Sequence, residues 1–244
     1  MVKDKKRIQV FEKPVDAEFF SLKGSIAIVI DVLRATSTII NALNNGCKGV
    51  VPVADVEQAL SLRNQKQDQL PLLCGERYSK RIEGFDLGNS PAEYQSKVVK
   101  DKTLIMTTTN GTRALLAAQD AKAVYVLSLL NLNATVNELT FFNEDLSIIC
   151  AGTNGQTSLE DNVCAGLLIL ELVGKSDKFL PENNYSTVIT QAMEYKDKLL
   201  TMLKMSEHGK YLEKIGYGRD LEFCSRLNSI NTCSVYENGI IKQK

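Results

Sequence analysis

Acidic, basic and amide side chains recur directly after short apolar segments of this chain. The residues at these positions are Asp31, Arg34, Glu76, Arg77, Asn110, Arg113 and Asn154. Arginine forms paired hydrogen bonds with phosphate, sulfonate or carboxylate oxygens, and carboxylates bind hard cations or activate water. These residue types at these positions predict chemistry on a small, strongly anionic, phosphorylated substrate.

The acidic residues indicate a magnesium ion, Mg2+, as the cofactor. The chain has one histidine, His208, and six cysteines without Cys-x-x-Cys spacing, so it offers no ligand pattern for zinc. A hard cation held by carboxylates is the remaining choice. We expect Asp31 and Glu76 to be the functional carboxylates, as metal ligands or as the base. Asp86 and Glu160 are expected to complete the metal site.

Other polar residues predict how the substrate is bound. Three arginines are expected to neutralise the charge of one substrate, and three polar side chains to donate hydrogen bonds to its oxygens. They are Arg34, Arg77 and Arg113 in the first group and Thr108, Asn110 and Asn154 in the second. The alternative for Arg34 or Arg113, each taken alone, is an internal ion pair with Asp31 or Glu76. His208 is placed outside this site, because a lone histidine more often packs or faces solvent than acts in catalysis.

Known phosphoryl-transfer signatures are missing from the sequence. No Gly-x-x-x-x-Gly-Lys-[Ser/Thr] string is present, which excludes a P-loop. A cysteine phosphatase needs Cys, five residues and then Arg, but Cys74 has Lys80 at that place. Cys74 and Cys150 lie in apolar runs and are expected to be buried as small hydrophobic residues. We therefore expect no cysteine nucleophile.

The elements that must position these residues follow one repeated pattern. A short apolar run ends in a polar loop, and a helical pattern follows; the runs are 26–30, 72–74, 104–106, 124–127 and 147–150. This alternation predicts a three-layer α/β/α fold with a mostly parallel sheet. Such sheets bind ligands beyond the carboxyl ends of their strands, where the polar residues stand. The similar Thr/Asn/Gly turns suggest two similar lobes from internal duplication.

Local signals mark several helices and one hairpin. Ser90-Pro91-Ala92-Glu93 has the pattern of a capping box, and Ser158 opens an expected helix over 159–173. For Asp161, in the first turn of that helix, capping is favoured over metal binding. Helices are also expected over 186–206 and 207–215. Asn238-Gly239 predicts a hairpin turn, and 175–184 is the best lobe boundary within a single domain over 1–244.

Composition narrows the class of protein. The 244 residues are 44% hydrophobic and 24% charged, with 29 basic and 29 acidic side chains and a pI near 6.6. This balance argues against a general nucleic-acid binder. The apolar runs are too short for a membrane span, and no apolar stretch follows the basic start as in a signal peptide. We expect a cytoplasmic protein with reduced thiols and leave the oligomeric state open, a homo-oligomer included.

Several strings together resemble one known family. They are Asp31-Val-Leu-Arg-Ala-Thr-Ser-Thr38, Gly75-Glu-Arg77, Ile82-Glu-Gly-Phe-Asp-Leu-Gly-Asn-Ser-Pro91, Thr107-Thr-Thr-Asn-Gly-Thr-Arg113, Gly152-Thr-Asn-Gly-Gln-Thr-Ser-Leu-Glu-Asp161 and Cys164-Ala-Gly166, with Ser206, His208, Gly216, Asp220 and Cys224 after them. Their order and density are similar to the 2-phosphosulfolactate phosphatase family over about 24–224. The tail after Cys224 departs from the family pattern, with Asn228 and Ser234-Val-Tyr236 in place of an aspartate and a Val-Pro strand.

The resemblance implies a magnesium-dependent acid phosphatase. Such an enzyme hydrolyses 2-phospho-3-sulfolactate to 3-sulfolactate and phosphate, a step of coenzyme M biosynthesis; another phosphorylated hydroxy acid remains an alternative substrate. A second alternative keeps the site but forms an aspartyl-phosphate on Asp31. A third is a non-catalytic sensor that binds an anionic metabolite.

Overall fold

The computed structural model describes residues 5–18, 20–65, 70–181 and 185–244, and these form the expected α/β fold. The strands are β1 (Lys6–Phe11), β2 (Ile26–Ile30), β3 (Gly49–Pro52), β4 (Leu72–Arg77), β5 (Lys80–Arg81), β6 (Thr103–Thr107), β7 (Ala123–Leu127), β8 (Leu146–Cys150), β9 (Phe179–Pro181), β10 (Ser234–Glu237) and β11 (Ile240–Gln243). They lie in one sheet in the order β5-β4-β6-β3-β11-β10-β7-β2-β8-β1-β9.

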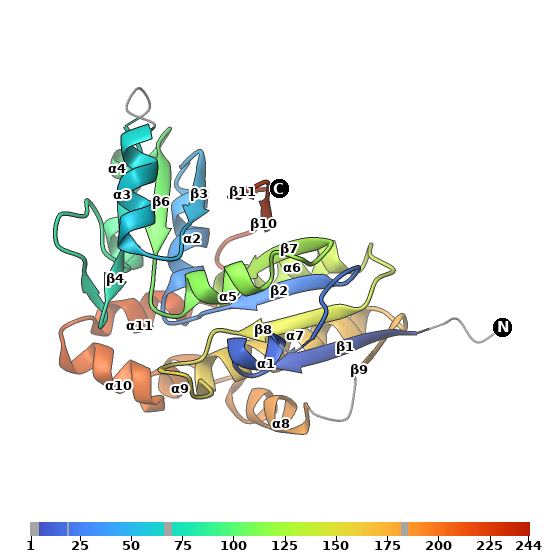
Figure 1. Cartoon of the computed structure of the whole chain (residues 1–244). Helices are drawn as coiled ribbons and strands as arrows, with labels where there is room; N and C mark the ends of the chain where they lie inside the picture. The colour runs from blue at the N-terminus through green and yellow to red at the C-terminus, as the bar shows by residue number, and fades with distance from the viewer. Residues whose placement is uncertain (1–4, 19, 66–69, 182–184) are drawn as a thin grey trace.

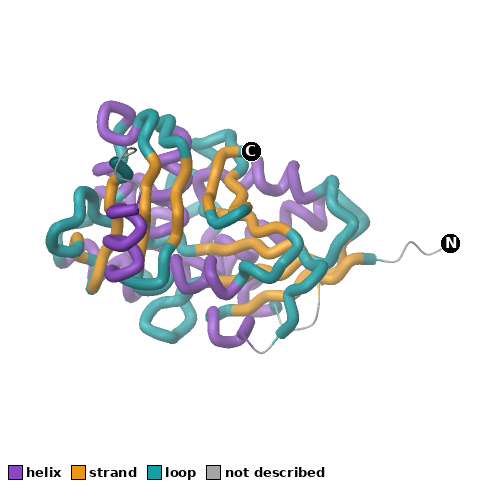
Figure 2. Tube along the Cα trace, turned by 45° about the horizontal axis from the view of Figure 1, so that its top comes forward, coloured by secondary structure: helices purple, strands orange, loops and turns teal. Residues whose placement is uncertain are grey.

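Helices cover both faces of this sheet, as Figure 2 shows. They are α1 (Pro14–Glu18), α2 (Ala35–Asn44), α3 (Val56–Gln65), α4 (Ser96–Val99), α5 (Gly111–Ala117), α6 (Leu132–Leu139), α7 (Leu159–Lys175), α8 (Ser186–Tyr195), α9 (Leu199–Met205), α10 (Glu207–Lys214) and α11 (Gly218–Cys224), with short 3-10 turns η2 (Pro91–Glu93) and η3 (Leu129–Asn131). The prediction of a three-layer α/β/α fold is confirmed. No helix in the described ranges is long and apolar enough to cross a membrane.

The sheet contains two groups of parallel strands. The strands β4, β6 and β3 form one group, and β7, β2, β8, β1 and β9 form the other. The predicted hairpin at Asn238-Gly239 is confirmed as β10–β11, and it joins the groups through antiparallel pairing on both sides. Figure 1 shows the strands of the two groups at a steep angle to each other, with α2 at the corner between them.

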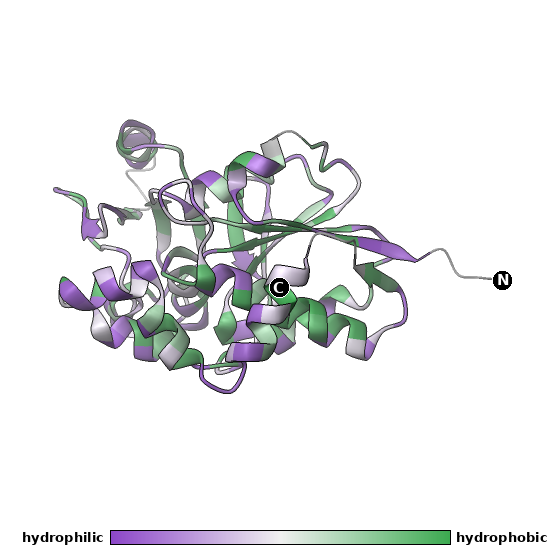
Figure 3. Ribbon diagram, turned by 90° about the horizontal axis from the view of Figure 1, so that it is seen from below, coloured by the Kyte–Doolittle hydropathy of each residue, from purple (hydrophilic) through white to green (hydrophobic). Residues whose placement is uncertain are grey.

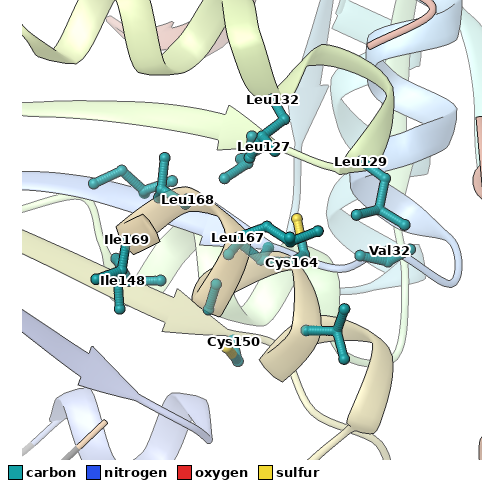
Figure 4. Close-up of a cluster of buried hydrophobic side chains, with 14 of the residues drawn as sticks. Val32, Leu127, Leu129, Leu132, Ile148, Cys150, Cys164, Leu167, Leu168 and Ile169 are labelled. Carbon is teal, nitrogen blue, oxygen red and sulfur yellow. The ribbon is translucent and has the colours of Figure 1, made fainter. Parts of the chain in front are cut away.

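The hydrophobic core is built on strands that are buried on both faces. All five residues of β2 are buried, and its side chains alternate between two clusters. Ile28 packs with residues of α6 and α7, whereas Val29 packs with residues of α2 and α5. Figure 4 shows part of the first cluster, including Leu132 of α6 and Leu168 of α7. In the other group Met106 faces the α2 side, while Ile105 packs near Ala59 of α3. In Figure 3 the middle strands are mostly hydrophobic, whereas the start of β1 beside the N-terminus and many outer turns of the helices are hydrophilic.

Some local predictions are wrong. Ser90 does not cap a helix: only a 3-10 turn follows it, and its hydroxyl donates to Asp220 instead. The helix expected over 186–206 is two helices, α8 and α9. Helix α8 crosses α7 at Gly166, where a β-carbon would come within 2.2 Å of the Val188 carbonyl oxygen. The strands β1, β3 and β9 were not predicted, because their sequences are short or carry polar residues.

The cap at Ser158 is confirmed: its hydroxyl accepts from the backbone N–H of Asp161 at 3.4 Å. Helix α7 begins at Leu159 as expected and extends to Lys175. The suggested lobe boundary at 175–184 falls partly outside the described residues, and its described part leads into strand β9 beside β1. Neither the single domain nor the internal duplication is tested by this arrangement, and both stay predictions.

Candidate active site

One cavity of about 360 Å³ lies where the two groups of strands present their carboxyl ends. Residues at the ends of β2, β4, β6 and β8 or in the loops after them line it, together with Asn89 before η2 and residues of α10. The lining residues are Asp31, Leu33, Arg34, Glu76, Tyr78, Ser79, Asn89, Thr109, Asn110, Thr153, Asn154, Glu207, His208 and Tyr211. The structure therefore brings together Asp31, Glu76, Arg34, Asn110 and Asn154 of the residues predicted for the site. Within each group the strands are parallel, so their loops leave at one edge, and the steep angle between the two groups brings these two edges together (Figure 1).

Asp31 is held rigidly at the end of β2. Its Oδ1 accepts from the backbone N–H of Ala35 at 3.0 Å, and the Thr36 hydroxyl bonds both its backbone N–H and its carbonyl. Burial raises the pKa of Asp31 to about 7; Glu76 and Glu160 add to this rise, while the Ala35 hydrogen bond and Arg34 oppose it. The site thus concentrates negative charge that a bound cation would compensate.

Glu76 ties together two loops of the cavity wall. Its Oε1 accepts from the backbone N–H of Thr109, and its Oε2 from that of Ser79, both at 2.7 Å. Gly75 makes this position possible: its φ is +148°, and a β-carbon there would lie 2.0 Å from the Thr107 carbonyl oxygen. The Glu76 carboxylate therefore fixes the turn after β6 and the tip of the β4–β5 hairpin.

Arg34 is buried and forms an internal ion pair, but not with either of the acids considered from the sequence. Its Nη1 donates to Asp220 Oδ2 at 2.7 Å, and its Nη2 donates to the Ser79 carbonyl at 2.9 Å. The guanidinium carbon lies 4.4 Å from the centre of the Tyr217 ring. Arg34 thus reaches the cavity with its orientation fixed from three sides.

Arg77, Arg113 and Thr108 line a neighbouring cavity of about 370 Å³, which shares Thr109 with the first. Arg77 donates to the Glu76 carbonyl at 2.8 Å and to the Thr107 hydroxyl at 3.0 Å. The Thr108 hydroxyl accepts from the Thr112 backbone N–H at the start of α5. The three arginines therefore lie in two adjoining cavities, and the structure does not bring them together in one.

Two of the expected metal ligands lie away from the cavity lining. Asp86 pairs with Arg63 at 3.0 Å and accepts from the Leu73 backbone N–H, because the chain returns alongside β4 at this point. Glu160 is buried, which raises its pKa, although side-chain hydrogen bonds with Ser206 and Ser158 oppose the rise. The structure thus corrects the expectation that Asp86 joins Asp31 at one metal site.

Asp161 does not cap α7. Its Oδ1 accepts from the Val32 backbone N–H at 2.9 Å and its Oδ2 from that of Gly152 at 3.1 Å. It therefore links the loops that follow β2 and β8, both of which contribute to the cavity. Burial raises the Asp161 pKa well above its usual range, and Asp31 and Glu160 add to this effect.

The cavity offers carboxylates for magnesium but not a complete set of protein ligands. The described part of the chain contains no preformed cluster of His, Cys, Asp and Glu side chains with metal-binding geometry. Magnesium, however, commonly keeps several waters and takes only one or two protein carboxylates together with substrate phosphate oxygens. Asp31 is buried with other acids near it, and it lines the cavity together with Glu76, which meets that requirement.

Of the cavity residues that were not predicted for the site, His208 and Asn89 are the most informative. His208 lines the cavity, although it was expected outside the site, and its Nε2 lies 3.2 Å from the Ser79 hydroxyl. Asn89 is 6% exposed, and its side-chain oxygen has no hydrogen-bond partner. Both residues belong to the sequence motifs that resemble the family, and this resemblance was the signal that could have assigned them to the site. The fold brings them to the cavity from distant parts of the chain.

Comparison with known proteins points to one family. The family model for 2-phosphosulpholactate phosphatase matches residues 13–239. A probable 2-phosphosulfolactate phosphatase of Symbiobacterium thermophilum is 42% identical over 219 residues, covering 89% of this chain and 94% of the relative. One of Caldanaerobacter subterraneus subsp. tengcongensis is 39% identical, covering 96% and 97%. One of Clostridium acetobutylicum is 40% identical, covering 90% and 93%.

Proposed function

The chain belongs to the 2-phosphosulfolactate phosphatase family, and from this membership and the acidic, arginine-lined cavity we propose that it hydrolyses 2-phospho-3-sulfolactate with the help of magnesium. Membership makes it a phosphoric monoester hydrolase. The products would be 3-sulfolactate and inorganic phosphate. The observation that carries the proposal is the convergence of Asp31, Glu76 and Arg34 on one cavity at the carboxyl ends of the strands.

Asp31 is the carboxylate that would hold the metal, with Glu76 nearby. When bound, magnesium would supply positive charge to the phosphoryl oxygens during hydrolysis. The Arg34 guanidinium would donate to an anionic substrate oxygen, and Asn110 and Asn154 would donate hydrogen bonds from the cavity rim. These groups are in place before the substrate arrives, which is the arrangement that favours stabilisation of developing charge.

The adjoining cavity offers a place for a second anionic group. A phosphorylated sulfonated hydroxy acid carries a phosphate, a carboxylate and a sulfonate. Arg77 and Arg113 line a space that meets the first cavity at Thr109. The phosphate would be bound beside Asp31, and another anionic group of the same molecule would be bound by these arginines.

The test is phosphate release from a panel of phosphorylated hydroxy acids. Metal-free protein, prepared with EDTA and gel filtration, is assayed alone, with added Mg2+ and with added Mn2+. We expect turnover of 2-phospho-3-sulfolactate that returns with either cation, because both prefer oxygen ligands. Undiminished turnover after exhaustive EDTA treatment contradicts the magnesium requirement. Tight binding of the substrate without phosphate release indicates a sensor instead.

A further inference from the structure

Asp220 of α11 contacts two separate parts of the cavity wall. Its Oδ2 accepts from Nη1 of Arg34 at 2.7 Å, and its Oδ1 accepts from the hydroxyl of Ser90 at 2.6 Å. Arg34 is 2% exposed and Asp220 is 3% exposed. A single buried carboxylate therefore holds the loop after β2 and the turn that precedes η2.

Each of these contacts leads directly to a cavity side chain. Arg34 itself lines the cavity, and Ser90 follows Asn89, which also lines it. The backbone carbonyl of Asn89 accepts from the Thr38 hydroxyl at 3.0 Å, so the turn is fixed on a second side. The Asn89 side-chain oxygen is buried without a partner. A buried acceptor left in this state in a ligand cavity points to a ligand that brings a hydrogen-bond donor.

Stability alone is a weak explanation for the Arg34–Asp220 pair. Removing two charges from water costs free energy that their attraction only partly returns, and well-packed apolar residues often serve as well. A pair of this kind does fix geometry, because the planar guanidinium is held by directional hydrogen bonds. Arg34 receives two such constraints besides Asp220, from the Ser79 carbonyl and the Tyr217 ring.

We propose that Asp220 is a positioning residue for the substrate site, which orients the Arg34 guanidinium toward an oxyanionic group of the ligand and the Asn89 side-chain oxygen toward a hydrogen-bond donor of the same ligand. Asp220 acts through these two residues and does not line the cavity itself. The inference rests on the proposed function for the identity of the substrate. It adds that anion binding in the cavity depends on a carboxylate behind the arginine.

The first test is Asp220→Asn, which keeps the shape and removes the charge. We expect KM for 2-phospho-3-sulfolactate to rise between about tenfold and a hundredfold, the range expected when a positioned group is displaced. Glu222→Gln is the matched control, since it removes an exposed acid from the same helix and should leave kcat and KM unchanged. A lower Tm for Asp220→Asn with wild-type kcat and KM assigns Asp220 a purely structural role and overturns the proposal.

The second test is chemical rescue. Arg34→Ala should lose activity and regain part of it in low millimolar guanidinium chloride, because the free cation can occupy the place beside Asp220. The double variant Arg34→Ala, Asp220→Asn should show no rescue. Equal rescue of both variants contradicts the proposal. If Arg34→Ala does not fold, as judged by circular dichroism, Arg34→Lys replaces it. The double variant Arg34→Lys, Asp220→Asn should then have a KM only slightly higher than that of Arg34→Lys alone. Effects of the two substitutions on KM that are independent and additive contradict the proposal.

A binding measurement separates this inference from the proposed function. The affinities of inorganic phosphate and of 3-sulfolactate for wild type and Asp220→Asn are measured by calorimetry, without turnover. Weaker binding of at least one anion to the variant supports the positioning role, even if the wild-type protein fails to hydrolyse the expected ester. Equal affinities for both anions contradict the positioning role, even if hydrolysis is observed.

Discussion

Gly111 lies against the carboxylate of Asp31 so closely that a β-carbon at position 111 would come within 2.6 Å of Asp31 Oδ2. The same β-carbon would lie 2.4 Å from that of Ala35. Gly111 opens α5 after strand β6, whereas Asp31 directly follows β2, so the contact joins the two groups of strands beside the cavity. The φ of Gly111 is not in the left-handed region, so space rather than backbone conformation requires glycine here.

We predict that Gly111→Ala impairs catalysis more than folding. The added methyl group must displace Asp31 or Ala35, and a shift of about 1 Å at a reacting group can cost roughly a hundredfold in rate. Gly174→Ala in α7 is the control, because nothing lies within 4 Å of its added β-carbon. The control should keep its activity and gain up to about 1 kcal/mol of stability from helix propensity. Similar kcat values for both variants would show that Asp31 tolerates the displacement.

Asp31→Asn should reduce turnover by roughly a hundredfold or more, the scale of losing a general acid–base group. Shape is retained, and the Asn side-chain oxygen can still accept from the Ala35 N–H, so the variant should remain folded. The measurement is kcat at saturating Mg2+, per folded molecule as judged by circular dichroism. Near-normal turnover in a folded variant removes Asp31 from the mechanism and transfers the role to Glu76.

The same variant should be more stable than wild type at alkaline pH when divalent cations are absent. The pKa of Asp31 is about 7 in the fold against 3.8 in the reference state, so the folded protein favours the protonated carboxyl. Wild type therefore loses stability as pH rises from about 4 through 7, and the variant lacks this loss. The difference in Tm between the two, in EDTA, should be small near pH 4 and grow toward pH 8. A difference that does not change with pH contradicts the raised pKa.

Cys74→Ser should keep most of the activity per folded molecule. Cys74 is fully buried, and burial raises the pKa of its thiol, so little thiolate exists at neutral pH. Cys150 is also fully buried, which raises the pKa of its thiol. The cysteines of the folded wild type should therefore react slowly with iodoacetamide, and the reaction should become fast when the protein is unfolded. Loss of turnover at an unchanged Tm would assign Cys74 a role in catalysis.

Local signals were sufficient to predict much of the fold. Strand β2 is a continuous apolar run, and such runs are typical of strands that are buried on both faces. The position of this strand in the chain and the polar residue after it could therefore be predicted from the sequence. The hairpin turn at Asn238-Gly239 was equally plain. Its location between the two groups of parallel strands was not, because strand order depends on pairing between distant segments that no local pattern records.

The site was predictable to the extent that it lies at strand ends. Asp31 and Glu76 could be found in this way, whereas Asp86 lies in the loop between β5 and η2 and pairs with Arg63. Asp220 and His208 lie on C-terminal helices, and only tertiary packing brings them to the cavity wall or behind it. Sequence position therefore identifies groups carried by the sheet edge and misses groups carried by helices packed across it.

The final prediction concerns the loss of stability in acid that buried His208 causes. Burial lowers the pKa of His208 to about 4 from 6.5; Arg34 lowers it further, and Glu76 opposes this. The unfolded chain therefore takes up a proton before the folded protein does, so acid favours unfolding between about pH 6.5 and pH 4. We expect the free energy of unfolding of wild type to fall by up to about 3 kcal/mol relative to that of His208→Gln over this interval, because the glutamine does not titrate.

Denaturant unfolding of both proteins at several pH values measures the difference. His208 is the only histidine in the chain, so its imidazole proton signals in a tag-free sample also report the pKa directly by NMR. A midpoint near 6.5, or a stability difference that is constant over the interval, would show that the imidazole is solvated and that its contact with Ser79 at the cavity wall is not maintained in solution.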